Sequence, residues 1–174
     1  GTYMGTMYAV DAVTGDVVWT TGGFGLIDYS SPAYDGSAIY FAAFGPGYEG
    51  MYVSLDATTG DLLWQTWLEG QPTGSSVAYA NGYIYGTCWD GYLRVLDAFD
   101  GSVLQKIALS MGGSTNSPAV SDGWVWVEDY DGNVYGFFGQ MPVGLIVSPL
   151  KQLKEVLPDS TVDYYVNVTN VGIS

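Results

Sequence analysis

The chain has 174 residues, which predicts one domain and part of a second. Charged residues make up 13% of it, and 4 basic against 18 acidic residues give a net charge of −14 with no histidine. So few Lys and Arg exclude a nucleic-acid-binding or basic lipid-binding surface, and the lack of His excludes Ser-His-Asp and Cys-His catalysis. The single cysteine, Cys88, excludes an intrachain disulfide. No apolar run of about 18 residues predicts a transmembrane helix.

The sequence repeats itself along most of its length. Three segments align without gaps and a fourth begins in the same way, at residues 5–19, 50–64, 91–105 and 132–139. Their leading glycines are spaced 45, 41 and 41 residues apart. A second motif alternates with the first, at residues 30–43, 75–88 and 116–129. Two motifs in phase over three periods indicate a repeat architecture.

Each repeat predicts four short strands. Apolar residues alternate with their neighbours at Met7 and Ala9, and at Val53 and Leu55, which is the pattern of a half-buried strand. Turn dipeptides that supply positive φ in tight hairpins separate these runs, at Asp35-Gly36, Asn81-Gly82, Asp90-Gly91, Asp122-Gly123 and Asp131-Gly132. Four strands in a unit of about 41 residues indicate the blade of a β-propeller.

The phase of the repeats places the chain within such a propeller. It predicts entry at the third strand of a blade, then two complete four-stranded antiparallel blades, then three strands of another. Closed propellers have about 4 to 8 blades, and this chain supplies about three and a half. We therefore expect a fragment of a longer polypeptide, with pairing to another copy as the alternative.

The repeats share the pattern Ala-x-Asp-x-x-Thr-Gly-x-x-x-Trp. It is complete at residues 9–19, has Ser54 in place of alanine in the second copy, and is degenerate in the third, where Gln105 replaces tryptophan. The pattern resembles the tryptophan-docking motif of the PQQ-like repeat family, the quinoprotein-dehydrogenase type of β-propeller, over residues 1–139. The resemblance implies that each motif tryptophan lies flat between two blades.

The residue types of the motif suit a structural role. An aspartate accepts backbone N–H groups in the turn that follows it, and a glycine takes the positive φ that the turn needs. We therefore expect these residues to hold the scaffold: Asp11, Gly15, Trp19, Asp56, Gly60, Trp64, Asp97 and Gly101.

A different module is predicted after the repeats. We assign residues 1–141 to the propeller blades, and residues 142–174 to a linker and the first strands of a β-sandwich. Residues 162–168 alternate as a strand does, and they resemble the opening of an immunoglobulin-like module of the CARDB or NEW3 kind. Residues 151–157 are the best helical candidate. Asn167 begins an N-glycosylation triplet, which fits an outside location.

Few residues predict chemistry. Asp129, Asp131 and Asn133 resemble part of a calcium loop, although the same residues serve an ordinary hairpin turn. By the resemblance, a quinoprotein dehydrogenase would need adjacent cysteines, calcium ligands, a catalytic aspartate and arginine for the quinone carboxylates. Cys88 has no neighbouring cysteine and Arg94 is the sole arginine. We predict no catalytic residue and no bound PQQ. For the loop at Asp129, Asp131 and Asn133 we predict an ordinary turn, with a calcium site as the alternative.

Aromatic residues offer a further kind of surface. Trp124 and Trp126 lie two apart on one predicted strand and hence on one face. Trp64, Trp67 and Trp89 form a second group. Packing between blades explains both groups better than stacking against sugars does.

The sequence thus predicts an all-β, non-catalytic protein of the cell surface or extracellular space, acting in adhesion, envelope or filament structure. Its expected partners are other surface proteins, further copies of itself, or glycans. Two alternatives stay open: a fragment of a PQQ-dependent dehydrogenase, and an envelope assembly scaffold similar to the propeller lipoprotein of the outer-membrane insertion machinery.

Overall fold

The structure is a computed structural model, and it describes residues 1–45, 47, 49–68, 75–109, 113–114 and 116–138. These residues form thirteen β-strands and no helix. The strands are β1 (Met7–Val10), β2 (Val17–Thr21), β3 (Ala33–Tyr34), β4 (Ala38–Phe44), β5 (Gly50–Asp56), β6 (Leu62–Trp67), β7 (Ala78–Ala80), β8 (Tyr83–Thr87), β9 (Tyr92–Asp97), β10 (Val103–Ala108), β11 (Ala119–Ser121), β12 (Trp124–Glu128) and β13 (Val134–Phe138). Over the same ranges, nothing helical is long and apolar enough to span a membrane.

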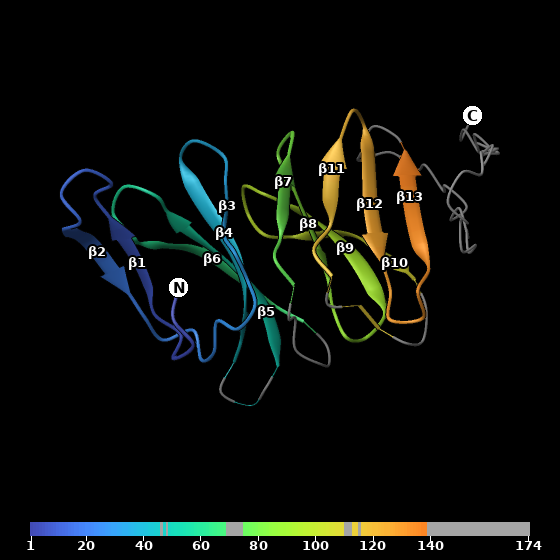
Figure 1. Cartoon of the computed structure of the whole chain (residues 1–174), viewed down its shortest axis with the longest axis horizontal. Coiled ribbons are helices and arrows are strands. Elements are labelled where there is room, and N and C mark those ends of the chain that lie inside the picture. The colour runs from blue at the N-terminus through green and yellow to red at the C-terminus, as the bar shows by residue number, and fades with distance from the viewer. Residues whose placement is uncertain (46, 48, 69–74, 110–112, 115, 139–174) are drawn as a thin grey trace, which may run out of the picture.

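The strands form four antiparallel sheets, each built from strands that follow one another in the chain. The sheets are β1–β2, β3–β4–β5–β6, β7–β8–β9–β10 and β11–β12–β13. Figure 1 shows them side by side in chain order, from β2 at one end to β13 at the other. Two four-stranded sheets between a two-stranded and a three-stranded sheet confirm the predicted propeller blades and their phase.

The first strands of successive sheets lie together at one edge. β3 contacts β7, and β7 contacts β11. Just before these strands, the backbone N–H of Ser31 donates to the hydroxyl of Ser76 at 2.8 Å, and that of Ser76 donates to the hydroxyl of Ser117 at 3.0 Å. One repeated serine therefore links the β3–β6 sheet to the β7–β10 sheet, and that sheet to the β11–β13 sheet, by the same hydrogen bond.

The hydrophobic core lies between the sheets. The cluster between the two four-stranded sheets contains Tyr52 and Trp64 from the first sheet and Ile84 and Leu96 from the second. Because neighbouring sheets cover both faces, β5 is buried continuously from Gly50 to Leu55. The half-buried alternation predicted around Val53 and Leu55 is therefore wrong, since it assumed a strand with one solvent-facing side.

The hairpin turns follow the sequence in most repeats. Asn81-Gly82 and Asp122-Gly123 have positive φ at both residues, as the tightest hairpins require. In Asp35-Gly36 only the glycine has positive φ. There the Asp35 carboxylate instead accepts the backbone N–H groups of Ser37 and Ala38, each at 2.7 Å, so the side chain rather than the backbone closes the turn.

Several predictions fall outside the described residues. These are the boundary between residues 141 and 142, the helical candidate at 151–157, the sandwich strand at 162–168 and the glycosylation triplet at Asn167. They remain predictions.

Candidate functional site

The motif tryptophan of β6 lies on the turn between β9 and β10. The indole Nε1 of Trp64 donates to the carbonyl of Ala98 at 2.9 Å. Two residues later, the hydroxyl of Thr66 donates to the carbonyl of Gly101 at 2.6 Å. A Cβ on Gly101 would lie 2.5 Å from Trp64 Cε3, so only glycine leaves room for the ring. Trp64 thus joins two neighbouring sheets through one turn.

The motif tryptophan of β2 makes the same contacts one sheet earlier. Trp19 Nε1 donates to the carbonyl of Ala57 at 3.0 Å, and the Thr21 hydroxyl donates to the carbonyl of Gly60 at 2.6 Å. A Cβ on Gly60 would lie 2.6 Å from Trp19 Cε3. We call residues 56–61 and 97–102 the docking turns, because each receives an indole from the preceding sheet.

Aspartate side chains build these turns. Asp56 Oδ1 accepts the backbone N–H groups of Thr58 at 2.8 Å and Thr59 at 2.9 Å, and Asp97 Oδ1 accepts that of Phe99 at 2.8 Å. The hydrogen bonds from the Thr59 and Thr58 amides lower the pKa of the Asp56 carboxyl below its ordinary value. The motif carboxylates therefore accept backbone hydrogen bonds that shape the turns, and this use leaves them unsuited to catalysis.

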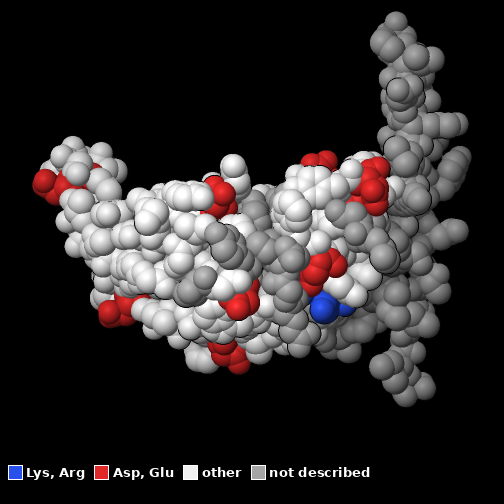
Figure 2. All heavy atoms as spheres, turned by 90° about the horizontal axis from the view of Figure 1, so that it is seen from below, with Lys and Arg blue, Asp and Glu red and all other residues white. Residues whose placement is uncertain are grey.

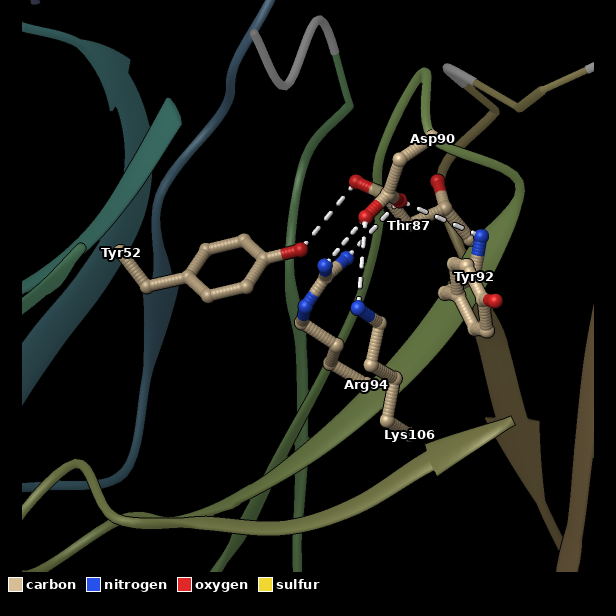
Figure 3. Close-up of polar contacts among 6 residues, drawn as sticks. All are labelled: Tyr52, Thr87, Asp90, Tyr92, Arg94 and Lys106. Carbon is tan, nitrogen blue, oxygen red and sulfur yellow. Dashed lines mark hydrogen bonds and ion pairs between the residues drawn. The ribbon is translucent and has the colours of Figure 1, made fainter. Parts of the chain in front are cut away.

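A polar cluster lies where β8, β9 and β10 meet. Arg94 on β9 is 3% exposed, and its guanidinium donates to both carboxylate oxygens of Asp90, with Nη1 at 3.0 Å from Oδ1 and Nη2 bonded to Oδ2. Lys106 Nζ on β10 lies 3.9 Å from the same Oδ2 and 4.3 Å from the centre of the Tyr92 ring. Figure 3 shows one carboxylate facing both cations.

A chain of hydrogen bonds crosses three sheets beside this cluster. The hydroxyl of Tyr52, on β5, donates to the carbonyl of Thr87, on β8, at 3.1 Å. The hydroxyl of Thr87 donates in turn to the carbonyl of Asn116, ahead of β11, at 2.7 Å. Complete burial raises the pKa of Tyr52, so it stays a neutral donor. A Cβ on Gly86 would lie 2.4 Å from the Tyr52 oxygen, which explains the glycine in that strand.

These residues do not fit a quinone cofactor. Burial alone would lower the pKa of Arg94, but the hydrogen bond and charge of Asp90 outweigh it and raise that pKa, so the guanidinium stays charged. It is nevertheless bound to Asp90 and closed to solvent, so it cannot also receive a quinone carboxylate. Burial raises the pKa of the Cys88 thiol, which makes it a poor nucleophile.

The predicted calcium loop uses its carboxylate within the protein. Asp129 Oδ1 accepts the Asn133 N–H at 2.9 Å, and Oδ2 accepts the Asn133 side-chain N–H at 2.8 Å and the Tyr135 hydroxyl at 2.7 Å. Asp131 is exposed, whereas Asp129 and Asn133 are buried. In the part of the chain that the structure describes, no three His, Cys, Asp or Glu side chains could hold a metal ion together. Calcium here stays a prediction.

Some aromatic residues that we expected between blades lie at the surface. Trp124 and Trp126 stack with ring centres 5.1 Å apart, so they share a face as predicted, but Trp126 is 40% exposed. Trp89 and Tyr130, in the β8–β9 and β12–β13 loops, meet edge to face at 5.8 Å and are 53% and 55% exposed. The prediction of burial is wrong for Trp89 because it lies in a loop beyond the sheets. Trp126 lies on the last sheet, whose outer face no other described sheet covers.

Most of the charged side chains on the visible surface are acidic. Figure 2 shows acidic side chains spread over the visible face and basic side chains at a single place beside one of them. The basic residues among those described are Arg94 and Lys106, and both belong to the Asp90 cluster. In the sequence, Trp89 directly precedes Asp90, and Tyr130 lies between Asp129 and Asp131.

The repeated sheets, the docking turns and the motif tryptophans define a PQQ-like repeat β-propeller. A family model described as outer membrane protein assembly factor BamB matches residues 1–65 and 49–139, and the chain belongs to that family. A search of curated proteins gave no significant match.

Solved structures show the same fold. BamB from Moraxella catarrhalis is 21% identical with a TM-score of 0.60, over 78% of this chain and 43% of that one. The computationally designed Ika4 protein is 19% identical with a TM-score of 0.64, over 78% and 81%. A europium-containing methanol dehydrogenase is 22% identical with a TM-score of 0.56, over 67% and 24%. The chain thus corresponds to less than half of the BamB structure.

Proposed function

We propose that this chain is a non-catalytic part of a β-propeller that binds other proteins outside the cytoplasm, in the cell envelope or at the cell surface. The observation that carries the proposal is the exposed aromatic pair Trp89 and Tyr130 on adjacent loops. Exposed tryptophan and tyrosine are the residue types that dominate protein-binding surfaces, because each offers a large rigid contact area with a polar group at its edge.

The ionisable side chains near this pair bond to other residues of the chain, which supports a binding role over an enzymatic one. Arg94 is bound to Asp90, and the carboxylate of Asp129 accepts three hydrogen bonds from Asn133 and Tyr135. These groups stabilise loops and are not available to a substrate. What the same loops present to solvent is the aromatic pair and the exposed carboxylate of Asp131, which suits a partner with apolar and basic side chains.

A role in envelope assembly is the more specific form of this proposal. It is supported by the family model, whose description names an outer membrane protein assembly factor, and by the likeness to the BamB structure. A role in adhesion or filaments, with glycans as partners, draws instead on the stacked pair Trp124 and Trp126. The assembly role has the stronger support, because the family match extends over most of the described chain.

Site-specific photocrosslinking in cells tests the proposal. A photoreactive residue is placed at Trp89, and a matched control is placed at Phe99, which is 92% exposed at the opposite end of β9. The proposal expects crosslinks from position 89 to envelope proteins and none of these from position 99. Equal crosslinking at both positions would contradict it. Stoichiometric binding of added PQQ together with dye-linked alcohol oxidation would favour the dehydrogenase alternative.

A further inference from the structure

The β8–β9 and β12–β13 loops contain the same tight turn. The backbone N–H of Gly91 donates to the carbonyl of Cys88 at 3.1 Å, and that of Gly132 donates to the carbonyl of Asp129 at 3.2 Å. Each bond joins the first and fourth residues of a β-turn, and both glycines have positive φ, at 79° and 80°. The two loops therefore hold the second residue of the turn in equivalent places.

A third copy of this turn precedes β1, where the N–H of Gly5 donates to the carbonyl of Thr2 at 3.0 Å and φ of Gly5 is 75°. We call residues 2–5, 88–91 and 129–132 the aromatic turns, because the second residue of each is aromatic and exposed: Tyr3, Trp89 and Tyr130. The aligned position of the second repeat is also aromatic, at Tyr48, which lies outside the described residues. The second position of such a turn accepts most residue types, so the turn itself does not require a ring there.

Trp89 lies in the middle of the described sheets. Its loop belongs to the β7–β10 sheet, which has another sheet on each side (Figure 1). Its ring meets that of Tyr130 edge to face, with ring centres 5.8 Å apart and ring planes at 69°. An edge-to-face contact covers one ring face of a pair. Since both residues stay more than half exposed, contact between the sheets uses only part of each ring, and the remaining ring surface can meet a partner.

Acidic side chains accompany these rings. Glu128 and Asp131, just before and within the last of the three turns, are exposed. The basic residues of the described chain, Arg94 and Lys106, both lie at Asp90, so neither of the other two carboxylates forms an ion pair with a described residue. The β8–β9 and β12–β13 loops lie at the lower end of the molecule in Figure 1, which is the end that Figure 2 faces. This end therefore combines aromatic rings with negative charge.

We infer that Trp89 and Tyr130, together with the carboxylates of Glu128 and Asp131, bind arginine side chains on an extended segment of a partner protein. A guanidinium stacks on an aromatic face and pairs with a carboxylate through two N–H groups, so it uses both kinds of group at this surface. The aromatic turns recur from sheet to sheet, so an extended segment that crosses the sheets meets more than one of them. A second copy of the chain does not fit, because its net charge is −14 and its sole arginine, Arg94, is buried. The inference rests on the proposed function and names the chemistry of its partner.

Binding of a fluorescein-labelled peptide of repeated Arg-Gly-Ser, followed by anisotropy at physiological salt, tests the aromatic part of the surface. Trp89→Ala should weaken binding about fivefold through the lost contact between cation and ring. Phe99→Ala is the matched control, since Phe99 is as exposed an aromatic residue at the opposite end of β9, and it should leave binding unchanged. A peptide of repeated Lys-Gly-Ser should bind about threefold more weakly, because an ammonium group neither stacks nor pairs through a planar fork.

The acidic part has its own matched pair on one sheet. Asp131→Asn should weaken binding of the arginine peptide about threefold. Asp122→Asn removes the same charge from the β11–β12 turn at the other end of that sheet, and it should leave binding unchanged because salt screens charges beyond about 8 Å. In a ¹⁵N-labelled chain, the arginine peptide should shift the indole N–H signal of Trp89 and leave that of the docked Trp64 in place.

Several results would overturn the inference. They are no binding of the arginine peptide, equal binding of the lysine peptide, and equal effects of the site variants and their controls. Unchanged binding by a Trp89→Ala variant of lowered Tm would overturn it too, because the rings would then serve only the packing of the sheets.

The crosslinking experiment separates this inference from the proposed function. Crosslinks from position 89 to envelope proteins, without binding of the arginine peptide, would reject the arginine-binding surface and leave the proposed function standing. Peptide binding that meets every expectation above, without those crosslinks, would support the surface and count against the envelope role.

Discussion

Two neighbouring interfaces between sheets differ in one feature, a tryptophan docked on a turn of the next sheet. Between the β3–β6 and β7–β10 sheets, Trp64 lies on the turn that Asp97 and Gly101 build. Between the β7–β10 and β11–β13 sheets, Gln105 stands at the position of Trp64, and Phe138 stands at the position of Asp97. That second interface is packed with apolar side chains, among them Leu93, Val125 and Phe137.

The comparison shows that the donor tryptophan and the receiving turn are lost together. Where the indole is absent, the aspartate that would shape its docking turn is absent as well. The second interface thus packs through apolar burial and the hydrogen bonds of Ser76 to Ser117 and of Thr87 to Asn116, and the docked indole is an additional directional contact at the first interface. The predictions that follow measure how much this unit contributes, from the largest expected effect to the smallest.

Removing the docked indole is expected to have the largest effect. Trp64 is 8% exposed, so Trp64→Ala should lower the free energy of unfolding by about 3 to 5 kcal/mol through the cavity it leaves. Gln105→Ala, at the aligned position of the next interface, should change it by about 0.5 kcal/mol or less. Urea unfolding of both variants makes the measurement, and equal losses would show that the two interfaces do not differ in this way.

The Asp90 cluster, which lies beside the first interface, comes next. Arg94→Met should lower the free energy of unfolding by about 2 to 3 kcal/mol, since it leaves a largely buried carboxylate without its main partner. Lys106→Met should cost about 0.5 kcal/mol, because Lys106 is 40% exposed and solvent screens its charge. Adding Asp90→Asn to Arg94→Met should recover part of the loss. A double variant as unstable as Arg94→Met would contradict the assigned pairing.

A smaller difference in the free energy of unfolding should separate substitutions in two turns of the same shape. A Cβ on Gly101 would meet Trp64, whereas a Cβ on Gly15 would meet no atom within 4 Å. Gly101→Ala and Gly15→Ala both place a side chain at positive φ, at 73° and 80°. Only the first also places a Cβ 2.5 Å from Trp64. Gly101→Ala should therefore cost about 1 to 2 kcal/mol more in thermal or urea unfolding. Equal costs would mean that the ring does not rest on the glycine.

The smallest effect concerns acid stability at the first interface. Tyr40, which stacks on Tyr79 of the next sheet at 5.7 Å, donates to Asp35 Oδ2 at 2.6 Å. Burial alone would raise the pKa of Asp35, but hydrogen bonds from Tyr40, Ala38 and Ser37 outweigh it and hold that pKa at about 2 instead of 3.8. The second interface has Ala80 at the position of Asp35.

The sign of the pH effect follows from that lowered pKa. The unfolded chain takes up the Asp35 proton near pH 3.8 and the folded chain only near pH 2, so the stabilisation is complete well above pH 3.8 and is lost as the pH falls toward 2. Asp35→Asn should flatten the decline over this range by about 1 kcal/mol, reduced by solvent screening. Unfolding midpoints at pH 4 and pH 2 measure it, and an unchanged slope would contradict the assignment.

The strand order could be predicted because the sequence marks both ends of each strand. Turn dipeptides and the Asp-x-x-Thr-Gly motif recur in phase, so the number of strands before, within and after the complete blades follows directly. The burial of β5 could not be predicted in the same way. A single repeat does not reveal that a sheet lies between two others, so the alternation around Val53 and Leu55 predicts a strand with one exposed side, whereas β5 is buried on both.

The contacts of the Asp90 cluster were harder to predict from the sequence than the strands. As the sole arginine, Arg94 suggests from the sequence only a contact with quinone carboxylates, whereas a hairpin brings it against Asp90 four residues earlier. The signal that could have found the pair is the Asp90-Gly91 turn with a cation just inside the next strand. The bond from Tyr52 to Thr87 offers no such signal, since it joins residues 35 positions apart in different sheets.

Hydrogen exchange at the indole nitrogens tests the central claim most directly. In a ¹⁵N-labelled chain, the Nε1–H of Trp64 is held by the carbonyl of Ala98, whereas Trp89 lies exposed in a loop. We predict that the Trp64 indole exchanges as slowly as the backbone amides of the core strands, while the Trp89 indole exchanges at the rate of a solvent-exposed group. Exchange at Trp64 as fast as at Trp89 would contradict the account that a docked tryptophan joins the blades.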